Sequence, residues 1–285
     1  MQEIILKQEE IQLKDFDCFD AKEILECGQI FRFKKIADKD LGEGYICFSL
    51  DKYAKIFGSG KNWTIKTKDV NYFYNFFDLQ RDYRSLCEQL SKKSSIMESA
   101  CFYGRGIRIL KQNAFETAIS FIISSNNNIK RIQGIIERLC QSLGSKTEEG
   151  YAFPTLTQML AADKDFFTQI GCGYRADYIY NALRTLADGF DLEGLKNMPT
   201  EQARKKLNEL KGVGSKVADC ILLFGLGKKD VFPVDTWIEK VYHSYFESGL
   251  LRREMADFFV ELFGNNAGFA QQYLFYYQRE GSFLK

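Results

Sequence analysis

Two glycines one residue apart, Gly212 and Gly214, separate two helical patterns. Residues 201–210 predict one helix, for which Thr200 is a suitable N-cap, and apolar residues within 217–224 repeat at the spacing of one face of a second helix. Glycine adopts positive φ without steric cost, so this pair can turn the chain sharply between the two helices. The segment therefore predicts a helix-hairpin-helix, which constrains the fold more than any other part of the chain.

The predicted hairpin has the features of a binding site for the phosphates of a nucleic-acid backbone. Backbone N–H groups at a helix N-terminus bind phosphate, and such contacts hold DNA without reading its sequence. Lys216 falls in the first turn of the second helix, and Asp235 follows in a Phe-Pro-Val-Asp segment. A helix N-terminus disfavours a charged ammonium, and Schiff-base catalysis requires a neutral amine. Lys216 is therefore a candidate nucleophile. Alternatively, it is a surface lysine on a DNA-binding hairpin, and Asp235 is also a suitable N-cap for the next helix.

Composition excludes several other classes of protein. The chain has 285 residues, 45% of them hydrophobic, and a net charge of +1, so any DNA site must come from local clustering of cations. The eight cysteines form no Cys-x-x-Cys pair, and the single histidine, His243, argues against a histidine-based metal site or a Ser-His-Asp triad. We see no signal peptide or other targeting signal and no run of transmembrane length, and therefore expect a cytoplasmic protein of prokaryotic type with reduced thiols.

Strand and helix signals are unevenly distributed along the chain. Short β-favouring runs dominate residues 1–95, whereas residues 96–285 are nearly all helical patterns. We predict an α+β fold, with a small N-terminal antiparallel sheet domain with flanking helices at 1–95 and a larger all-helical domain at 96–285 that carries the helix-hairpin-helix at about 201–226. The predicted strands are 4–6, 31–33, 45–50, 53–57 and 63–67, and the predicted helices are 72–77, 82–90, 115–125, 129–143, 156–162, 177–187, 201–210, 217–224, 236–245, 252–263 and 269–277.

Five motifs, in order along the chain, resemble those of the 8-oxoguanine DNA glycosylases of the eukaryotic type, a family within the helix-hairpin-helix DNA glycosylases. They are Cys-Gly-Gln-x-Phe-Arg at 27–32, a triple-asparagine segment at 120–129, Gly-Tyr-Arg-Ala at 173–176, the hairpin at 213–220 and a C-terminal helix at 267–275. The iron–sulfur cysteine cluster of some sister glycosylases is missing after the hairpin, which argues against the endonuclease III and adenine-glycosylase branches.

The resemblance implies a bifunctional base-excision repair enzyme, a DNA N-glycosylase with AP lyase activity. Such an enzyme takes its target base out of the stack. Lys216 would attack the sugar C1′, expel 8-oxoguanine, preferably opposite cytosine, and form an imine, after which β-elimination would cleave the strand. Asp235 would stabilise the positive charge that develops on the sugar.

The resemblance also implies a base pocket and a DNA-binding surface. The Gly28 carbonyl would accept a hydrogen bond from N7–H of 8-oxoguanine, which guanine lacks. Gln271 would read the pairing edge of the base, Phe275 would stack on one face and Cys220 would lie near the other. The implied DNA-binding residues are Asn126 in the gap left by the base, Tyr174 beside it, Arg131 and Arg175 at the orphaned cytosine, and Gly212, Gly214 and Val217 in the hairpin.

The residues alone leave alternatives open. Without the resemblance, Gly28 is equally a turn glycine, Phe275 and Cys220 are typical core residues, and Arg131 and Arg175 are typical solvated charges. A glycosylase for alkylated or other oxidised purines is the alternative enzyme, and a non-catalytic DNA-binding module is the alternative class. Trp237 stands where some relatives carry a histidine.

The resemblance implies no required cofactor and no iron–sulfur cluster. It is compatible with a monovalent or divalent cation on the hairpin backbone, and the sequence shows no side-chain metal site. The expected partner is damaged double-stranded DNA, with no membrane partner, and we expect a monomer associated with the nucleoid.

Overall fold

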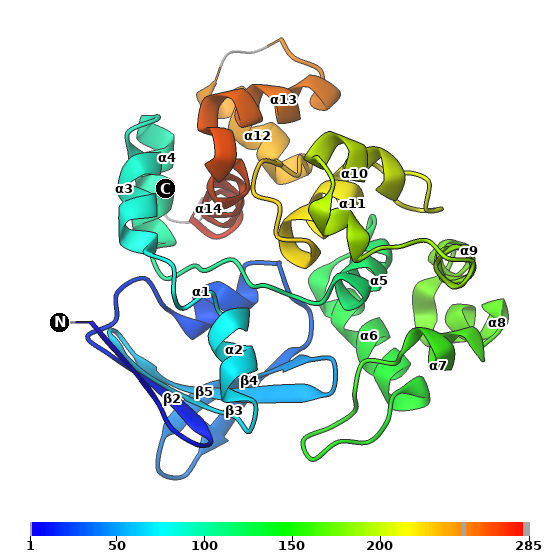
Figure 1. Ribbon diagram of the computed structural model, residues 1–285. Helices are drawn as coiled ribbons and strands as arrows, with labels where there is room; N and C mark the ends of the chain where they lie inside the picture. Colours follow the sequence, from blue (N-terminus) through cyan, green and yellow to red (C-terminus); the bar gives the residue numbers. More distant parts are fainter. Residues whose placement is uncertain (1, 247–248, 282–285) are drawn as a thin grey trace.

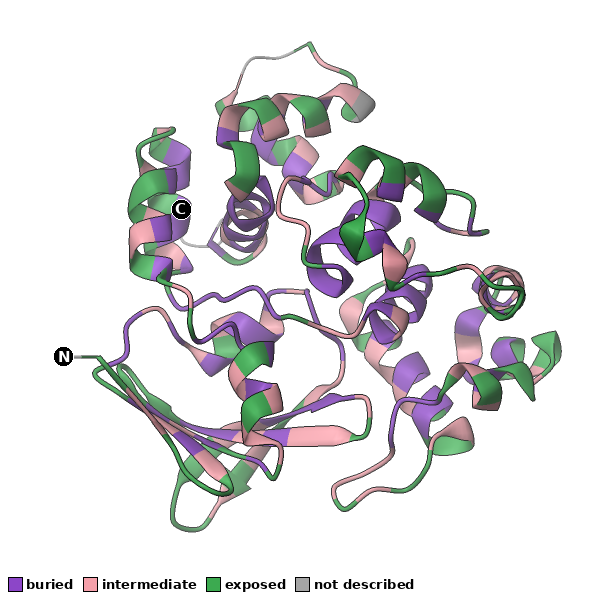
Figure 2. Cartoon of the chain, viewed as in Figure 1, coloured by how far each residue is buried: buried purple, intermediate pink, exposed green. Residues whose placement is uncertain are grey.

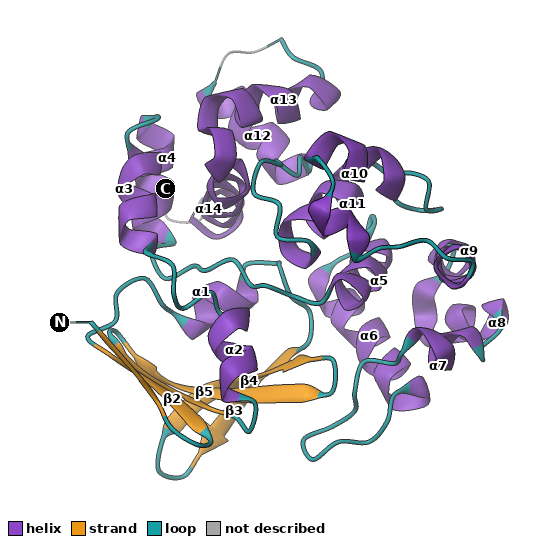
Figure 3. Ribbon diagram, in the orientation of Figure 1, coloured by secondary structure: helices purple, strands orange, loops and turns teal. Residues whose placement is uncertain are grey.

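The N-terminal part of the chain forms one antiparallel sheet, as predicted. The computed structural model describes residues 2–246 and 249–281. Its six-stranded sheet has the order β1-β2-β6-β5-β4-β3, and the helices lie over and beside it (Figures 1 and 3). The elements of this part are β1 (Glu3–Leu6), β2 (Glu10–Lys14), α1 (Ala21–Glu26), β3 (Phe33–Asp38), β4 (Gly42–Ser49), β5 (Lys52–Ser59), β6 (Asn62–Lys66) and α2 (Val70–Phe76).

One face of the sheet forms a small core with α1 and α2. Side chains alternate between the two faces of a strand, so Ile11 and Leu13 of β2 both point inward. They pair with Ile65 and Trp63 of β6 and pack with Phe73 of α2. This apolar face places α1, and the loop that follows it, at the edge of the sheet domain nearest the helical part (Figure 1).

Helices form the rest of the described chain, and their buried faces make a second core (Figure 2). Within this core Phe121 stacks on Phe224, with ring centroids 5.5 Å apart. No helix in the described ranges is long and apolar enough to cross a bilayer. The helices are α3 (Tyr83–Ser91), α4 (Ser95–Tyr103), α5 (Ala114–Ser124), α6 (Ile129–Leu143), α7 (Leu156–Leu160), α8 (Lys164–Phe167), α9 (Arg175–Ala187), α10 (Thr200–Leu207), α11 (Ser215–Cys220), α12 (Thr236–Tyr245), α13 (Arg252–Phe263) and α14 (Ala267–Glu280).

The structure differs from the sequence predictions mainly in short segments. β2, α1, α4 and α8 were not predicted from the sequence pattern. The strand predicted at 31–33 is wrong for its first two residues, because β3 begins at Phe33. Phe31 and Arg32 turn instead toward the helical part, where Phe31 packs on Phe121 and Arg32 pairs with Glu116. The domain boundary at residue 95 stays a prediction.

Candidate active site

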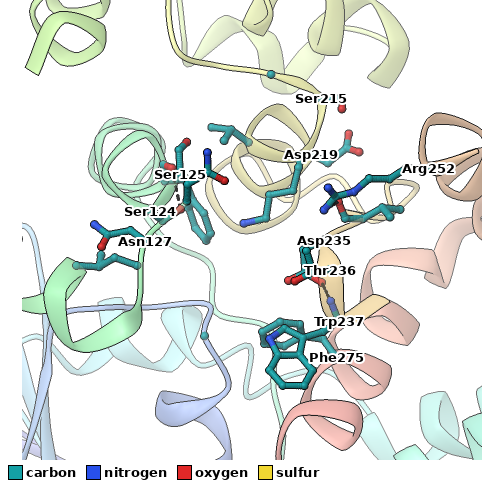
Figure 4. A pocket seen from close by; sticks show the side chains of 18 of the residues that line it. Ser124, Ser125, Asn127, Ser215, Asp219, Asp235, Thr236, Trp237, Arg252 and Phe275 are labelled. Carbon is teal, nitrogen blue, oxygen red and sulfur yellow. Dashed lines mark hydrogen bonds between the residues drawn. The ribbon is translucent and has the colours of Figure 1, made fainter. Parts of the chain in front are cut away.

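One cavity of about 1250 Å³ opens where the hairpin, the α5–α6 loop, the start of α12 and the end of α14 meet. Figure 4 shows Ser125 and Asn127 on one side of it and Asp235 and Phe275 on another. The structure therefore brings distant segments to one place. The predicted site residues that line the cavity are Gly28, Asn126, Gly212, Gly214, Lys216, Val217, Asp235 and Phe275.

The hairpin has the geometry that its glycines predict. Gly212 has φ +87°, and a Cβ there would lie 2.5 Å from Tyr178, so glycine allows both the turn and the close approach to α9. The Val213 N–H donates to the Leu210 carbonyl and closes the turn. Gly214 is the N-cap of α11 and has no side chain to cap it. The first N–H groups of α11 are therefore open to a phosphate.

The first helix of the motif, α10, is anchored differently from the prediction. Thr200 is not its N-cap, because Pro199 takes that position and the Thr200 hydroxyl donates to Asp230. Arg204 of α10 donates to Asp219 of α11 at 2.7 Å. Burial raises the pKa of Asp219, and the charge of Arg204 opposes this rise. This pair of a half-buried arginine and a buried aspartate fastens the two helices on either side of the hairpin, and the motif spacing did not predict it.

Lys216 lies in the first turn of α11, half-buried, with its amine 5.1 Å from the centre of the Phe121 ring. Cys220 follows one turn later and is buried. Burial raises the pKa of the Cys220 thiol to about 11, although the charge and hydrogen bond of Lys216 oppose the rise. Cys220 is therefore a neutral thiol beside the Lys216 amine, outside the lining of the cavity.

The Asp235 carboxylate is held by the backbone at the start of α12. Its Oδ1 accepts hydrogen bonds from the N–H groups of Trp237 and Ile238, both at 3.0 Å, which confirms Asp235 as an N-cap. Both bonds use Oδ1, and the carboxylate faces the cavity (Figure 4). A carboxylate fixed in this way is preorganised to stabilise positive charge there.

The loop after α1 presents Gly28 to the cavity. Gly28 has φ +87°, and its Cβ position would lie 3.2 Å from the Phe275 ring. Its neighbours are held firmly, because Gln272 donates to the Cys27 carbonyl and Gln112 donates to the Gln29 carbonyl. The described residues supply no hydrogen bond to the Gly28 carbonyl itself. The Gly28 carbonyl is therefore a free acceptor between two carbonyls that already accept hydrogen bonds. Recognition of an N–H group on a base requires such a free acceptor.

The Gln29 side chain explains why this loop is rigid. It is fully buried, and its amide donates to the carbonyls of Ile24 and Arg108 and accepts from the Leu110 N–H. Gln29 belongs to the Cys-Gly-Gln-x-Phe-Arg motif, but its role as the anchor of this loop was not predicted. The only sequence signal for this role is the position of Gln29 directly after Gly28.

Helix α14 contributes Gln271 and Phe275 on one face. The Gln271 amide donates to the Pro233 carbonyl at 3.2 Å, and its Oε1 is buried with no partner among the described residues. This orientation leaves an acceptor for the N–H groups on the pairing edge of guanine-type bases. Gln271 does not line the cavity in this structure. A base that contacts Gln271 must therefore displace side chains that now separate it from the cavity.

The three consecutive asparagines have different environments. Asn128 caps α6 by accepting from the Arg131 N–H, and Asn127 donates to the Ile123 carbonyl. Asn126 is exposed and has φ +47°, and its side chain makes no hydrogen bond to another described residue. Asn126 is thus the asparagine whose side chain is free to enter a duplex.

Arg131, Tyr174 and Arg175 gather around this loop. Arg175 is buried and donates to the carbonyls of Ser125 and Asn126 at 2.6 and 2.8 Å. Tyr174 is 52% exposed, and its hydroxyl lies 3.3 Å from the same Ser125 carbonyl. Arg131 is exposed. Arg175 therefore positions the loop in this structure, and its contact with an orphaned cytosine stays a prediction.

The described part of the chain shows no side-chain site for a metal ion. Within residues 2–246 and 249–281, no group of three or more His, Cys, Asp or Glu side chains is arranged to hold a metal ion.

Comparison with known proteins finds two family models that follow each other along the chain. The model described as the 8-oxoguanine DNA glycosylase N-terminal domain matches residues 10–118. The model described as the HhH-GPD superfamily base excision DNA repair protein matches residues 119–255.

Individual relatives agree with these models. The chain is 33% identical to the N-glycosylase/DNA lyase OGG1 of Arabidopsis thaliana over 70% of this chain, a match that spans 60% of that protein. It is 34% identical to a protein of Methanothermobacter thermautotrophicus named "Probable N-glycosylase/DNA lyase", over 73% of this chain and 74% of that protein. Among solved structures, the 8-oxoguanine glycosylase/lyase of Clostridium acetobutylicum, in complex with double-stranded DNA containing cytosine opposite 8-oxoguanine, matches with a TM-score of 0.91 and 34% identity, covering 99% of this chain and 98% of that chain.

Proposed function

The chain belongs to the 8-oxoguanine DNA glycosylase family of the HhH-GPD superfamily, and we propose that it removes 8-oxoguanine opposite cytosine from double-stranded DNA and then cleaves the strand. One observation carries this proposal: Lys216 and Asp235 line the same cavity as Phe275 and Gly28, whose carbonyl accepts no hydrogen bond from the described residues. A nucleophile and a fixed carboxylate thus share a space with groups suited to bind a purine.

The proposed chemistry begins at the sugar of the flipped nucleotide. The Lys216 amine attacks C1′ as the bond from C1′ to N9 breaks, and the base leaves with the electron pair and gains a proton. Asp235 stabilises the positive charge on the sugar as this bond breaks. The adduct opens to an imine, loss of a proton from C2′ expels the 3′ phosphate, and hydrolysis of the imine returns the lysine.

Recognition follows from hydrogen-bond complementarity. The Gly28 carbonyl accepts from N7–H of the lesion, and guanine has a bare acceptor at N7. A guanine at this position leaves the carbonyl unpaired, at a cost of about 1–3 kcal/mol. Asn126 fills the space left by the base, with Tyr174, Arg175 and Arg131 around it, while the hairpin residues Gly212, Gly214 and Val217 hold the backbone.

Borohydride trapping tests the proposal. We expect a covalent protein–DNA adduct on a duplex with one 8-oxoguanine opposite cytosine and none on the undamaged duplex, because only an imine is reduced to a stable amine. DNA binding without an adduct and without base release would overturn the proposal in favour of a binding module. Trapping on alkylated purines but not on 8-oxoguanine would assign a different lesion.

The remaining features are part of the same proposal. We propose that the protein acts as a cytoplasmic monomer on nucleoid DNA, with damaged duplex as its partner. It requires no cofactor or iron–sulfur cluster, and a monovalent or divalent cation on the carbonyls of the hairpin backbone is compatible with it.

Arg131→Ala is expected to weaken the preference for cytosine opposite the lesion by about tenfold, because an arginine at a base edge is a common source of such discrimination. The measurement is the single-turnover excision rate opposite each of the four bases. Lys130→Ala removes a neighbouring exposed cation and serves as the control, for which we expect an unchanged ranking. An unchanged ranking in Arg131→Ala would mean that Arg131 is a surface charge only.

A further inference from the structure

The guanidinium of Arg279 has one group without a partner. The side chain is 12% exposed; its Nε donates to Glu280, and one terminal nitrogen, Nη2, donates to the Glu26 carbonyl. The other, Nη1, is buried and has no hydrogen-bond partner among the described residues. A buried donor without an acceptor costs free energy, so such groups in folded proteins call for an explanation.

The unpartnered nitrogen lies next to Gly28, a residue that lines the cavity already described. It lies 3.1 Å from the position that a Cβ on Gly28 would take. The guanidinium lies 5.1 Å from the centre of the Phe275 ring, within cation–π distance. Gly28, Phe275 and Arg279 all line the cavity. Arg279 thus places an unpartnered donor next to Gly28, whose carbonyl accepts no hydrogen bond from the described residues.

Helix α14 sets the order of these groups. Gln271, Phe275 and Arg279 are spaced four residues apart and share one face, so Gln271 and Arg279 lie about 12 Å apart along the axis with Phe275 between them. Each of the two outer residues carries a buried atom without a hydrogen-bond partner among the described residues. On Gln271 it is the acceptor Oε1, and on Arg279 it is the donor Nη1. A purine stacked on Phe275 would therefore meet an acceptor at one end and a donor at the other.

8-Oxoguanine has the complementary pattern. Its pairing edge carries N1–H and N2–H donors, and the opposite end carries the O8 carbonyl, next to N7–H. We propose that Nη1 of Arg279 donates a hydrogen bond to O8 of the flipped base while the Gly28 carbonyl accepts from N7–H. This assignment rests on the proposed function and makes Arg279 a second residue that separates the lesion from guanine, which has C8–H and a bare N7.

The test measures binding in the Lys216→Gln background, where excision is expected to be too slow to disturb the binding equilibrium. Three duplexes are compared, with 8-oxoguanine, 8-thioguanine or guanine opposite cytosine. 8-Thioguanine keeps N7–H but replaces O8 with sulfur, a weaker hydrogen-bond acceptor. Adding Arg279→Met is expected to weaken binding of the 8-oxoguanine duplex by about 10- to 100-fold, because hydrogen bonds from a charged donor are strong, and to change binding of the 8-thioguanine duplex much less.

Comparing the two modified duplexes separates recognition of O8 by Arg279 from support of the Gly28 loop by Arg279. Arg279 also holds the Glu26 carbonyl, so Arg279→Met could merely disturb the Gly28 loop; an equal loss on the 8-oxoguanine and 8-thioguanine duplexes would show this and overturn the proposal. Glu280→Gln removes the exposed carboxylate beside Arg279 and is expected to leave binding unchanged. If Lys216→Gln with Arg279 intact does not prefer 8-oxoguanine over guanine, the proposed function fails as well.

Discussion

Lys216→Gln is expected to lower the rate of 8-oxoguanine excision about a thousandfold or more, and to abolish borohydride trapping, because loss of a nucleophile removes the covalent step and not merely one contact. Glutamine has a similar length and no amine, so the cavity keeps its shape. The measurement is base release under single turnover, with the affinity for the 8-oxoguanine duplex determined in parallel. We expect that affinity to stay close to that of the parent protein.

Lys211→Gln is the matched control, since Lys211 is on the same hairpin but its amine pairs with Asp177 at 2.6 Å. It removes an equal charge without touching the cavity, and we expect excision and trapping to persist. Excision that continues in Lys216→Gln would contradict the assignment of the nucleophile. A loss of lesion binding together with excision would point instead to a failure of the hairpin to fold.

The parts of the site that could be predicted are those with local signals. The helices at 129–143 and 236–245 have the predicted bounds, and Asn128 and Asp235 cap them through their own side chains. Gly212 has the positive φ that a tight turn between two helices requires. In each case residues a few positions apart determine the structure, so a linear pattern is enough to find it.

The missed helices α1, α4 and α8 are short and carry local N-caps, whereas other missed features depend on contacts between distant residues. β2 has alternating apolar residues but is only five residues long, and it is defined by its pairing with β1 and β6. Arg279 reads in the sequence as one more charge near the end of the chain, and its importance arises only because the fold places its guanidinium next to Gly28.

The ion pair between Arg32 and Glu116 is the other place where a single change is expected to have a large effect. Their side chains are only 8% and 10% exposed and lie 3.0 Å apart. Burial opposes the charge of Arg32, yet the attraction of Glu116 leaves the pKa of the guanidinium above its ordinary value. Arg32 also donates to the carbonyls of Leu50 and Tyr151, so it joins the sheet domain to α5 and the loop after α6.

Arg32→Met is expected to lower the free energy of unfolding by about 3–5 kcal/mol, because it leaves the Glu116 carboxylate buried without its cation. Chemical denaturation measures this loss. The decisive comparison is with the double variant Arg32→Met, Glu116→Gln. In the parent protein the Leu50 N–H donates to the Glu116 carboxylate at 2.7 Å. A glutamine at 116 can still accept this hydrogen bond but carries no charge. The double variant should therefore be more stable than Arg32→Met alone. If the two are equally destabilised, the cost comes from the lost carbonyl contacts and packing of Arg32, and the stranded charge is not its cause.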